Sequence, residues 1–106
     1  MAASVLYKAA AEAEIDDAFG TYEQQRQGLG LEFLDELARI EGHLRANPAL
    51  YQRVEGQPVA GDLRRAVLRR FPYGLFYVVE DGQVIVLACF HLHRDPQSRE
   101  ELLRAR

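Results

Sequence analysis

An Asp-Gly pair at positions 81 and 82, between two apolar runs, constrains the fold of this chain more than any other feature. A two-residue type I′ turn needs positive φ at both positions, and an Asp-Gly pair accepts this geometry. We therefore predict a β-hairpin whose strands cover residues 75–80 and 84–92. Residues 84–90 are apolar at both alternating positions, which indicates a central strand that is covered on both faces.

Two amphipathic helices are predicted ahead of this hairpin. Residues 9–27 and residues 31–47 each carry apolar side chains at helical spacing, and an Asn-Pro pair at 47–48 ends the second helix. Only a glycine-rich turn at residues 28–30 separates them. Two helices of similar length with so short a connection should form an antiparallel hairpin.

The order of these elements predicts an α+β fold in a single domain that spans residues 1–106. A short strand at residues 5–8 precedes the helical hairpin, and residues 49–62 form a loop. A further strand at residues 63–71 leads into the β-hairpin. The expected sheet therefore has three antiparallel strands in the order β-α-α-β-β-β, and a short C-terminal helix or tail follows it.

The helical hairpin can cover only one face of that sheet. The other face needs a cover as well, because a large exposed apolar face in a soluble protein marks an interaction site. We expect the cover to be either the C-terminal segment with Leu102 and Leu103 or a second protein.

Composition limits the class of this protein. The net charge of −3 and a pI near 5.6 argue against broad affinity for nucleic acids. Acidic residues concentrate before Gly56 and arginines after it, so the basic end could face an acidic partner. No apolar stretch approaches the ~18 residues of a membrane helix, and the N-terminus lacks the pattern of a signal peptide, so a cytoplasmic location is expected. The single cysteine, Cys89, lies in the most apolar strand and should be a buried core residue.

Four residues are candidates for catalytic roles: Arg70, His91, His93 and Arg94. A metal-independent ribonuclease needs a base, an acid and cations that stabilise the charge on the phosphorane, and histidine with arginine can fill these roles. The alternative is a strand end whose polar side chains are simply solvated. His91 and His93 share one strand face and could supply two metal ligands, but no third ligand stands at a recognisable spacing. We therefore expect neither a metal nor a cofactor.

Six segments, in this order along the chain, closely resemble the ParE/RelE superfamily of toxins from toxin–antitoxin (plasmid stabilisation) operons. They are residues 12–16, 22–26, 28–30 with 33–34, 47–48, 68–73 and 91–96. The resemblance spans nearly the whole chain and implies the same order of strand, helical hairpin and sheet.

The superfamily has two well-known activities. RelE-like members are ribosome-dependent mRNA endonucleases, and ParE-like members poison DNA gyrase without an enzymatic site of their own. The nuclease branch typically carries an arginine beside a tyrosine, whereas Gly74 follows Tyr73 here. That branch also tends to place a catalytic tyrosine where residues 95–98 contain none. These departures favour the ParE-like branch.

The resemblance implies a cognate antitoxin that wraps an extended or helical tail around the helical hairpin and the sheet edge. The candidate antitoxin contacts are Phe33, Leu37, Arg64 and Arg65. DNA gyrase is the expected target, with the ribosome and mRNA as the alternative. A toxin-derived interaction module without toxicity also stays open, as does the choice between a homo-oligomer and a toxin–antitoxin hetero-oligomer.

Overall fold

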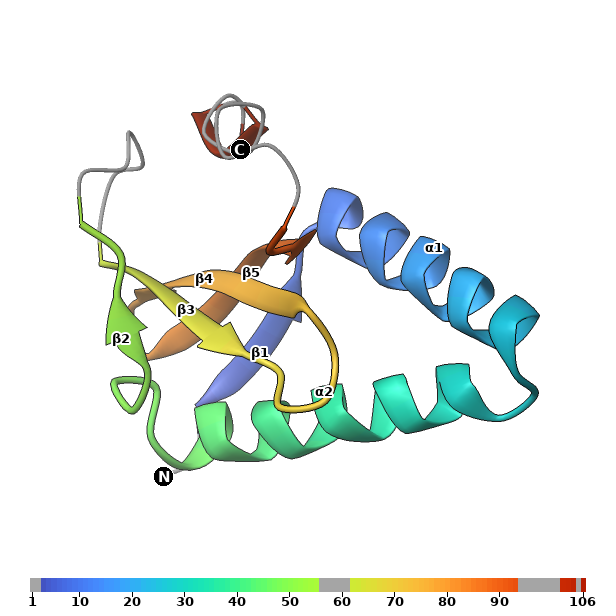
Figure 1. The fold of residues 1–106 in the computed structure, drawn as a ribbon. Helices are drawn as coiled ribbons and strands as arrows, with labels where there is room; N and C mark the ends of the chain where they lie inside the picture. Colours follow the sequence, from blue (N-terminus) through green and yellow to red (C-terminus); the bar gives the residue numbers. More distant parts are fainter. Residues whose placement is uncertain (1–2, 56–61, 94–101, 105) are drawn as a thin grey trace.

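A mixed five-stranded sheet and a helical hairpin form the two main layers of the molecule (Figure 1). The computed structural model describes residues 3–55, 62–93, 102–104 and 106. Its elements are β1 (Ser4–Tyr7), α1 (Ala9–Gln25), α2 (Leu29–Ala46), β2 (Gln52–Arg53), β3 (Leu63–Val67), β4 (Tyr73–Glu80) and β5 (Gln83–His91). Among the described residues, no helix combines the length and the apolar character that crossing a membrane requires.

The sheet has the order β1-β5-β4-β3-β2. The α+β class and the order of the main elements are confirmed, but the expectation of three antiparallel strands is wrong. β1 runs parallel to β5, at Val5 opposite Val84, and joins the same sheet. β2 adds two residues, in a segment expected to be a loop, antiparallel to β3. Neither strand pairing could be predicted from a local sequence pattern. The pairing of β1 with β5 joins segments far apart in the chain, and β2 consists of only two exposed residues.

The β-hairpin is confirmed. Asp81 has a φ of 51° and Gly82 a φ of 73°, so both turn residues adopt the left-handed conformation that a type I′ turn needs. Glu80, the last residue of β4, pairs with Gln83, the first residue of β5, and this pair closes the turn. β5 lies between β1 and β4, as expected for a central strand.

The turn between the helices is held by Glu23, a residue of α1. Its carboxylate accepts hydrogen bonds from the backbone N–H of Gly28 at 3.2 Å and of Gly30 at 2.8 Å. These groups belong to the start of α2, where N–H groups have no partner within the helix. A Cβ at Gly30 would lie 2.7 Å from the Phe19 ring, so the two helices approach too closely there for any larger residue. α2 therefore begins at Leu29, two residues earlier than expected.

The sheet separates two apolar clusters. The larger one lies on the helix side and includes Phe33, Ile40 and Tyr77. The smaller one, on the other face, contains Phe76 and Leu103, and Leu103 is only 1% exposed. The C-terminal segment, one of the two expected covers, therefore packs on this face through Leu103, whereas Leu102 is exposed. Figure 1 shows the chain end on the side of the sheet opposite α2.

Arg106 anchors that C-terminal segment to the rest of the fold. Its guanidinium makes two hydrogen bonds of 3.0 Å to the Glu14 carboxylate of α1 and one of 2.9 Å to the Leu87 carbonyl of β5. Glu14 also accepts the Cys89 N–H at 3.0 Å. Leu87 and Cys89 lie beyond the stretch of β5 that pairs with β1. The Leu87 carbonyl and the Cys89 N–H therefore find their hydrogen-bond partners in side chains.

Cys89 is buried, as the sequence predicted. Burial, with a smaller contribution from the nearby Glu14 carboxylate, raises the pKa of its thiol to about 12. Because the thiolate is the reactive form and only about one thiol in 10⁴ is ionised at pH 8, we expect the folded protein to react very slowly with Ellman's reagent. The same protein in urea should react at the rate of an ordinary cysteine. Rapid labelling of the folded protein would contradict this assignment.

Candidate functional site

Two of the residues considered for nuclease chemistry, His91 and His93, lie at the end of β5, beside the loop between β3 and β4. Tyr73, the first residue of β4, pairs with His91, the last of β5. The Leu92 N–H donates to the Pro72 carbonyl at 2.7 Å, so the β3–β4 loop and the end of β5 are neighbours. Arg94 lies outside the described residues.

The two histidines contact each other directly. Their ring centroids are 5.6 Å apart, and the His93 N–H donates to Nδ1 of His91 at 3.2 Å. An imidazole that accepts at Nδ1 carries its proton on Nε2 when neutral. His91 also packs edge-on against Tyr73 at 5.2 Å, whereas His93 is exposed. The pair could exchange protons with a ligand, but this geometry equally suits a solvated strand end.

The guanidinium of Arg70 contacts α2. It lies 2.6 Å from the Glu32 carboxylate and 5.5 Å from the centroid of the Phe71 ring. Arg26 approaches the same carboxylate at 2.8 Å. Hydrogen bonds from Arg70 and then Arg26 hold the pKa of Glu32 below its ordinary value. The charge of Arg70 is therefore compensated by an acid, and its side chain stays 59% exposed.

Residues 68–72 form a loop, although the sequence predicted that the strand would continue to residue 71. Glu36 explains this difference. Its carboxylate, on α2, accepts the N–H of Arg69 at 2.9 Å and the N–H of Arg70 at 3.2 Å. The sequence analysis missed Glu36. A signal was present, because a carboxylate three residues after Phe33 and four before Ile40 falls on the apolar face of its helix.

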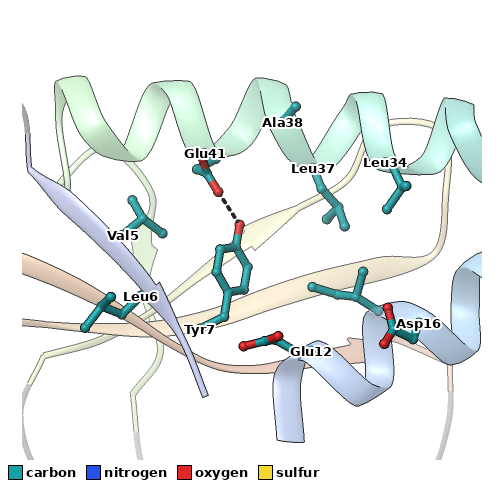
Figure 2. A pocket seen from close by; sticks show the side chains of 10 residues that line it. Val5, Leu6, Tyr7, Glu12, Asp16, Leu34, Leu37, Ala38 and Glu41 are labelled. Atoms are coloured by element: carbon teal, nitrogen blue, oxygen red, sulfur yellow. Dashed lines mark hydrogen bonds between the residues drawn. The ribbon is translucent and has the colours of Figure 1, made fainter. Parts of the chain in front are cut away.

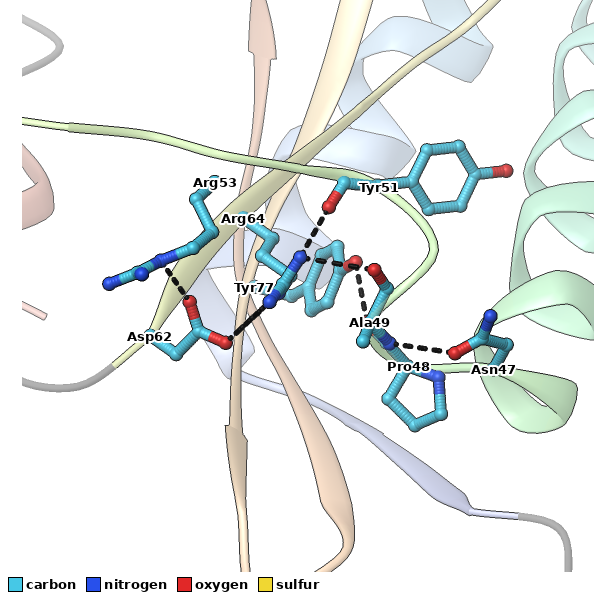
Figure 3. A network of polar contacts seen from close by, with 8 residues as sticks. All are labelled: Asn47, Pro48, Ala49, Tyr51, Arg53, Asp62, Arg64 and Tyr77. Atoms are coloured by element: carbon cyan, nitrogen blue, oxygen red, sulfur yellow. Dashed lines mark hydrogen bonds and ion pairs between the residues drawn. The ribbon is translucent and has the colours of Figure 1, made fainter.

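Arg64, one of the candidate antitoxin contacts, organises the chain after α2 (Figure 3). Its guanidinium donates to the Tyr51 carbonyl at 2.7 Å and to the Ala49 carbonyl at 3.1 Å, and it pairs with Asp62 at 2.9 Å. Its side chain is 16% exposed. An unpaired guanidinium on the helix side of the sheet would be costly, and Arg64 avoids this cost because two carbonyls and an acid surround it.

Arg65 faces the other side of the sheet. It stands opposite Phe76, a member of the smaller apolar cluster, whereas Arg64 stands opposite Tyr77 of the larger one. Cross-strand partners share a face. The two arginines therefore do not form one surface, although they are neighbours in sequence.

A groove of about 550 Å³ opens between β1, α1 and α2. We call it the hairpin groove, and Figure 2 shows the side chains that line it. The antitoxin candidate Leu37 lines it and is 6% exposed, and the neighbouring Leu34 is 36% exposed. Phe33, the other apolar candidate, has no exposed surface and belongs to the core. On the β1 side, Leu6 lines the groove and is 52% exposed.

Carboxylates are the only charged groups among the lining residues of the hairpin groove: Glu12, Asp16 and Glu41. The Tyr7 hydroxyl donates to Glu41 at 2.8 Å (Figure 2). Burial, and then this contact with a carboxylate, raise the pKa of Tyr7 above its ordinary value, so the phenol remains a neutral donor. Arg45 pairs with Glu41 at 3.1 Å.

Within residues 3–55, 62–93 and the described C-terminal positions, no three His, Cys, Asp or Glu side chains are placed to hold a metal ion together. The two adjacent histidines thus have no third ligand in this part of the chain.

Comparisons with known proteins agree with the fold. The family model described as the ParE toxin of the type II toxin–antitoxin system parDE matches residues 5–96. A solved structure titled "Chromosomal ParDE TA system from P. aeruginosa" superposes with a TM-score of 0.71 at 19% sequence identity, and covers 86% of this chain and 97% of that chain. No relative was found among curated protein sequences. Since the family model matches most of its length, this chain belongs to the ParE toxin family of type II toxin–antitoxin systems.

Proposed function

We propose that this toxin acts by inhibiting DNA gyrase through surface contacts, and that a cognate antitoxin neutralises it in the cytoplasm as a toxin–antitoxin hetero-oligomer. The packing at Gly74 supports this proposal most directly. A Cβ at position 74 would lie 3.1 Å from Cδ2 of Leu92. The position beside Tyr73, where the nuclease branch has an arginine, is therefore occupied by packed apolar atoms.

The environment of Arg70 supports the same choice. A cation that stabilises a phosphorane must be directed at the reacting phosphate. Here the guanidinium pairs with Glu32 and stacks near Phe71, on the α2 side of the loop. A gyrase inhibitor has no such requirement, because inhibition by binding needs only a complementary surface.

The runner-up is a ribosome-dependent mRNA endonuclease that uses Arg70, His91, His93 and Arg94. One observation favours it, namely the contact between the two imidazoles beside the β3–β4 loop. A general acid and a general base can be drawn from such a pair.

The purified toxin distinguishes these activities in two assays. We expect it to abolish supercoiling of relaxed plasmid by gyrase and to leave mRNA on translating ribosomes intact. Added antitoxin should restore supercoiling. Replacement of His91 or His93 by alanine should leave gyrase inhibition within about threefold, since the proposal gives neither imidazole a part in it, whereas loss of a general acid or base lowers catalysis about 10²–10⁴-fold. Codon-specific mRNA cuts in a primer-extension assay, lost in the His93→Ala protein, would reject the gyrase proposal and support the endonuclease.

A further inference from the structure

A second hollow, of about 360 Å³, lies between α2 and the loop that joins β3 to β4. We call it the arginine pocket, and it is lined by Glu32, Asp35, Glu36, Arg39, Arg69 and Arg70. None of these residues lines the hairpin groove, although α2 contributes to both. We infer that the toxin contacts gyrase through the arginine pocket, and that the pocket binds acidic side chains of gyrase. This inference rests on the proposed function and names the place and the chemistry of the contact.

One face of a helix and one anchored loop build the arginine pocket. Its residues on α2, at positions 32, 35, 36 and 39, have the spacing of a single helix face. The Glu36 carboxylate holds the loop against this face, because it accepts the N–H groups of Arg69 and Arg70. Figure 1 shows the loop between β3 and β4 beside α2. A surface fixed in this way loses little conformational entropy when it binds a partner.

Two of the three carboxylates in the pocket are already used within the toxin. Glu36 is only 9% exposed, and its oxygens accept the two backbone N–H groups of the loop. Glu32 accepts hydrogen bonds from Arg70 at 2.6 Å and from Arg26 at 2.8 Å. Both guanidinium groups that share Glu32 have side chains that are 59% exposed. Their positive charges together exceed the single charge of this carboxylate.

The guanidinium groups of the pocket keep N–H donors for a partner. Arg69 is exposed, and its side chain makes no ion pair or hydrogen bond within the described part of the chain. Among the same residues, Arg39 and Arg70 each pair with a single carboxylate. A guanidinium carries five donors in a planar fork that matches the two oxygens of a carboxylate. Because Asp35 is the one exposed acid among the lining residues, donors outnumber acceptors and the pocket favours an anionic partner.

Two observations favour carboxylates of a protein over phosphates of DNA. The net charge of −3 opposes the long-range attraction to DNA on which phosphate contacts depend. The exposed Asp35 beside the arginines repels a run of phosphates, whereas a protein surface can place a hydrogen-bond donor next to its acidic side chains. Such complementary charge favours the right partner and raises the association rate.

Two charge reversals in the full-length toxin test the location of the contact. Arg69→Glu changes the pocket, and Arg104→Glu makes the same change in net charge at an exposed arginine of the C-terminal segment, outside the pocket. Arg69→Glu should raise the toxin concentration that half-inhibits supercoiling by gyrase at least about tenfold, and Arg104→Glu less than about threefold. Equal values for the two variants would overturn the inference and keep gyrase as the target. A wild-type toxin that does not inhibit gyrase would overturn the proposed function itself.

Binding to gyrase without DNA, measured by surface plasmon resonance, tests the chemistry of the contact. The Kd of Arg69→Glu should again be at least about tenfold above that of the wild type. A loss of affinity that appears only when gyrase carries DNA would assign the pocket to phosphates and overturn the contact with acidic side chains. Thermal melts check that the variants fold. If Arg69→Glu does not fold, Arg69→Ala, which removes the guanidinium without adding a charge, should still raise the Kd at least about threefold, and an unchanged Kd would reject the inference.

Discussion

Replacement of Phe33 by alanine is expected to lower the free energy of unfolding by about 3–5 kcal/mol, because it removes a fully buried ring and leaves a cavity. The ring lies at the centre of an aromatic cluster, with centroids 5.5 Å from Tyr22 and 5.4 Å from both Phe71 and Tyr73. In a domain of this size, such a loss corresponds to a fall in Tm of more than about 10 °C. Urea unfolding followed by circular dichroism measures it.

The neighbouring residue supplies the control for Phe33. Leu34 lines the hairpin groove and is 36% exposed, so Leu34→Ala should cost less than about 1 kcal/mol of stability. If Phe33→Ala does not fold at all, Phe33→Leu should still fold with an intermediate stability. Equal urea midpoints for the wild type and Phe33→Ala would show that Phe33 is not part of the core.

Glu36→Ala is expected to destabilise the protein by about 3 kcal/mol. Two backbone N–H groups, of Arg69 and Arg70, lose a charged acceptor, and each such hydrogen bond is worth about 1.5–3 kcal/mol. Glu36 is only 9% exposed, so water cannot replace the carboxylate fully. Urea unfolding gives the total effect, and hydrogen exchange at the amides of residues 69 and 70 should accelerate first, because the loop loses its anchor to α2.

Two variants separate this role of Glu36 from a general effect of charge. Glu36→Gln keeps one carbonyl oxygen as an acceptor and should lose about half as much stability. Asp35→Ala removes an adjacent, exposed carboxylate and should change stability by less than about 0.5 kcal/mol. A loss in Asp35→Ala as large as that in Glu36→Ala would show that net charge, and not the anchoring of the loop, is responsible.

Local patterns were sufficient for the elements that depend on neighbours in sequence. The turn at Asp81 and Gly82 follows from backbone sterics, and the helical hairpin follows from apolar periodicity and the glycines at its turn. The burial of Cys89 follows from the apolar strand around it. Several short segments in the right order were enough to identify the toxin family, because they reflect these same local constraints.

Only the tertiary structure decided the features that depend on residues far apart in sequence. The parallel pairing of β1 with β5 joins segments about 80 residues apart, and it places β1 where it forms one wall of the hairpin groove. Glu36 ends β3 early by binding N–H groups 33 and 34 positions further along the chain. Arg64 and Arg65 are the same residue type at neighbouring positions, but their surroundings differ. Side chains alternate along β3, so Arg64 lies among the carbonyls after α2 and Arg65 lies on the opposite face of the sheet. The sequence by itself determined the local conformations and the family, whereas long-range pairing and side-chain contacts determined which residues remain exposed to a partner.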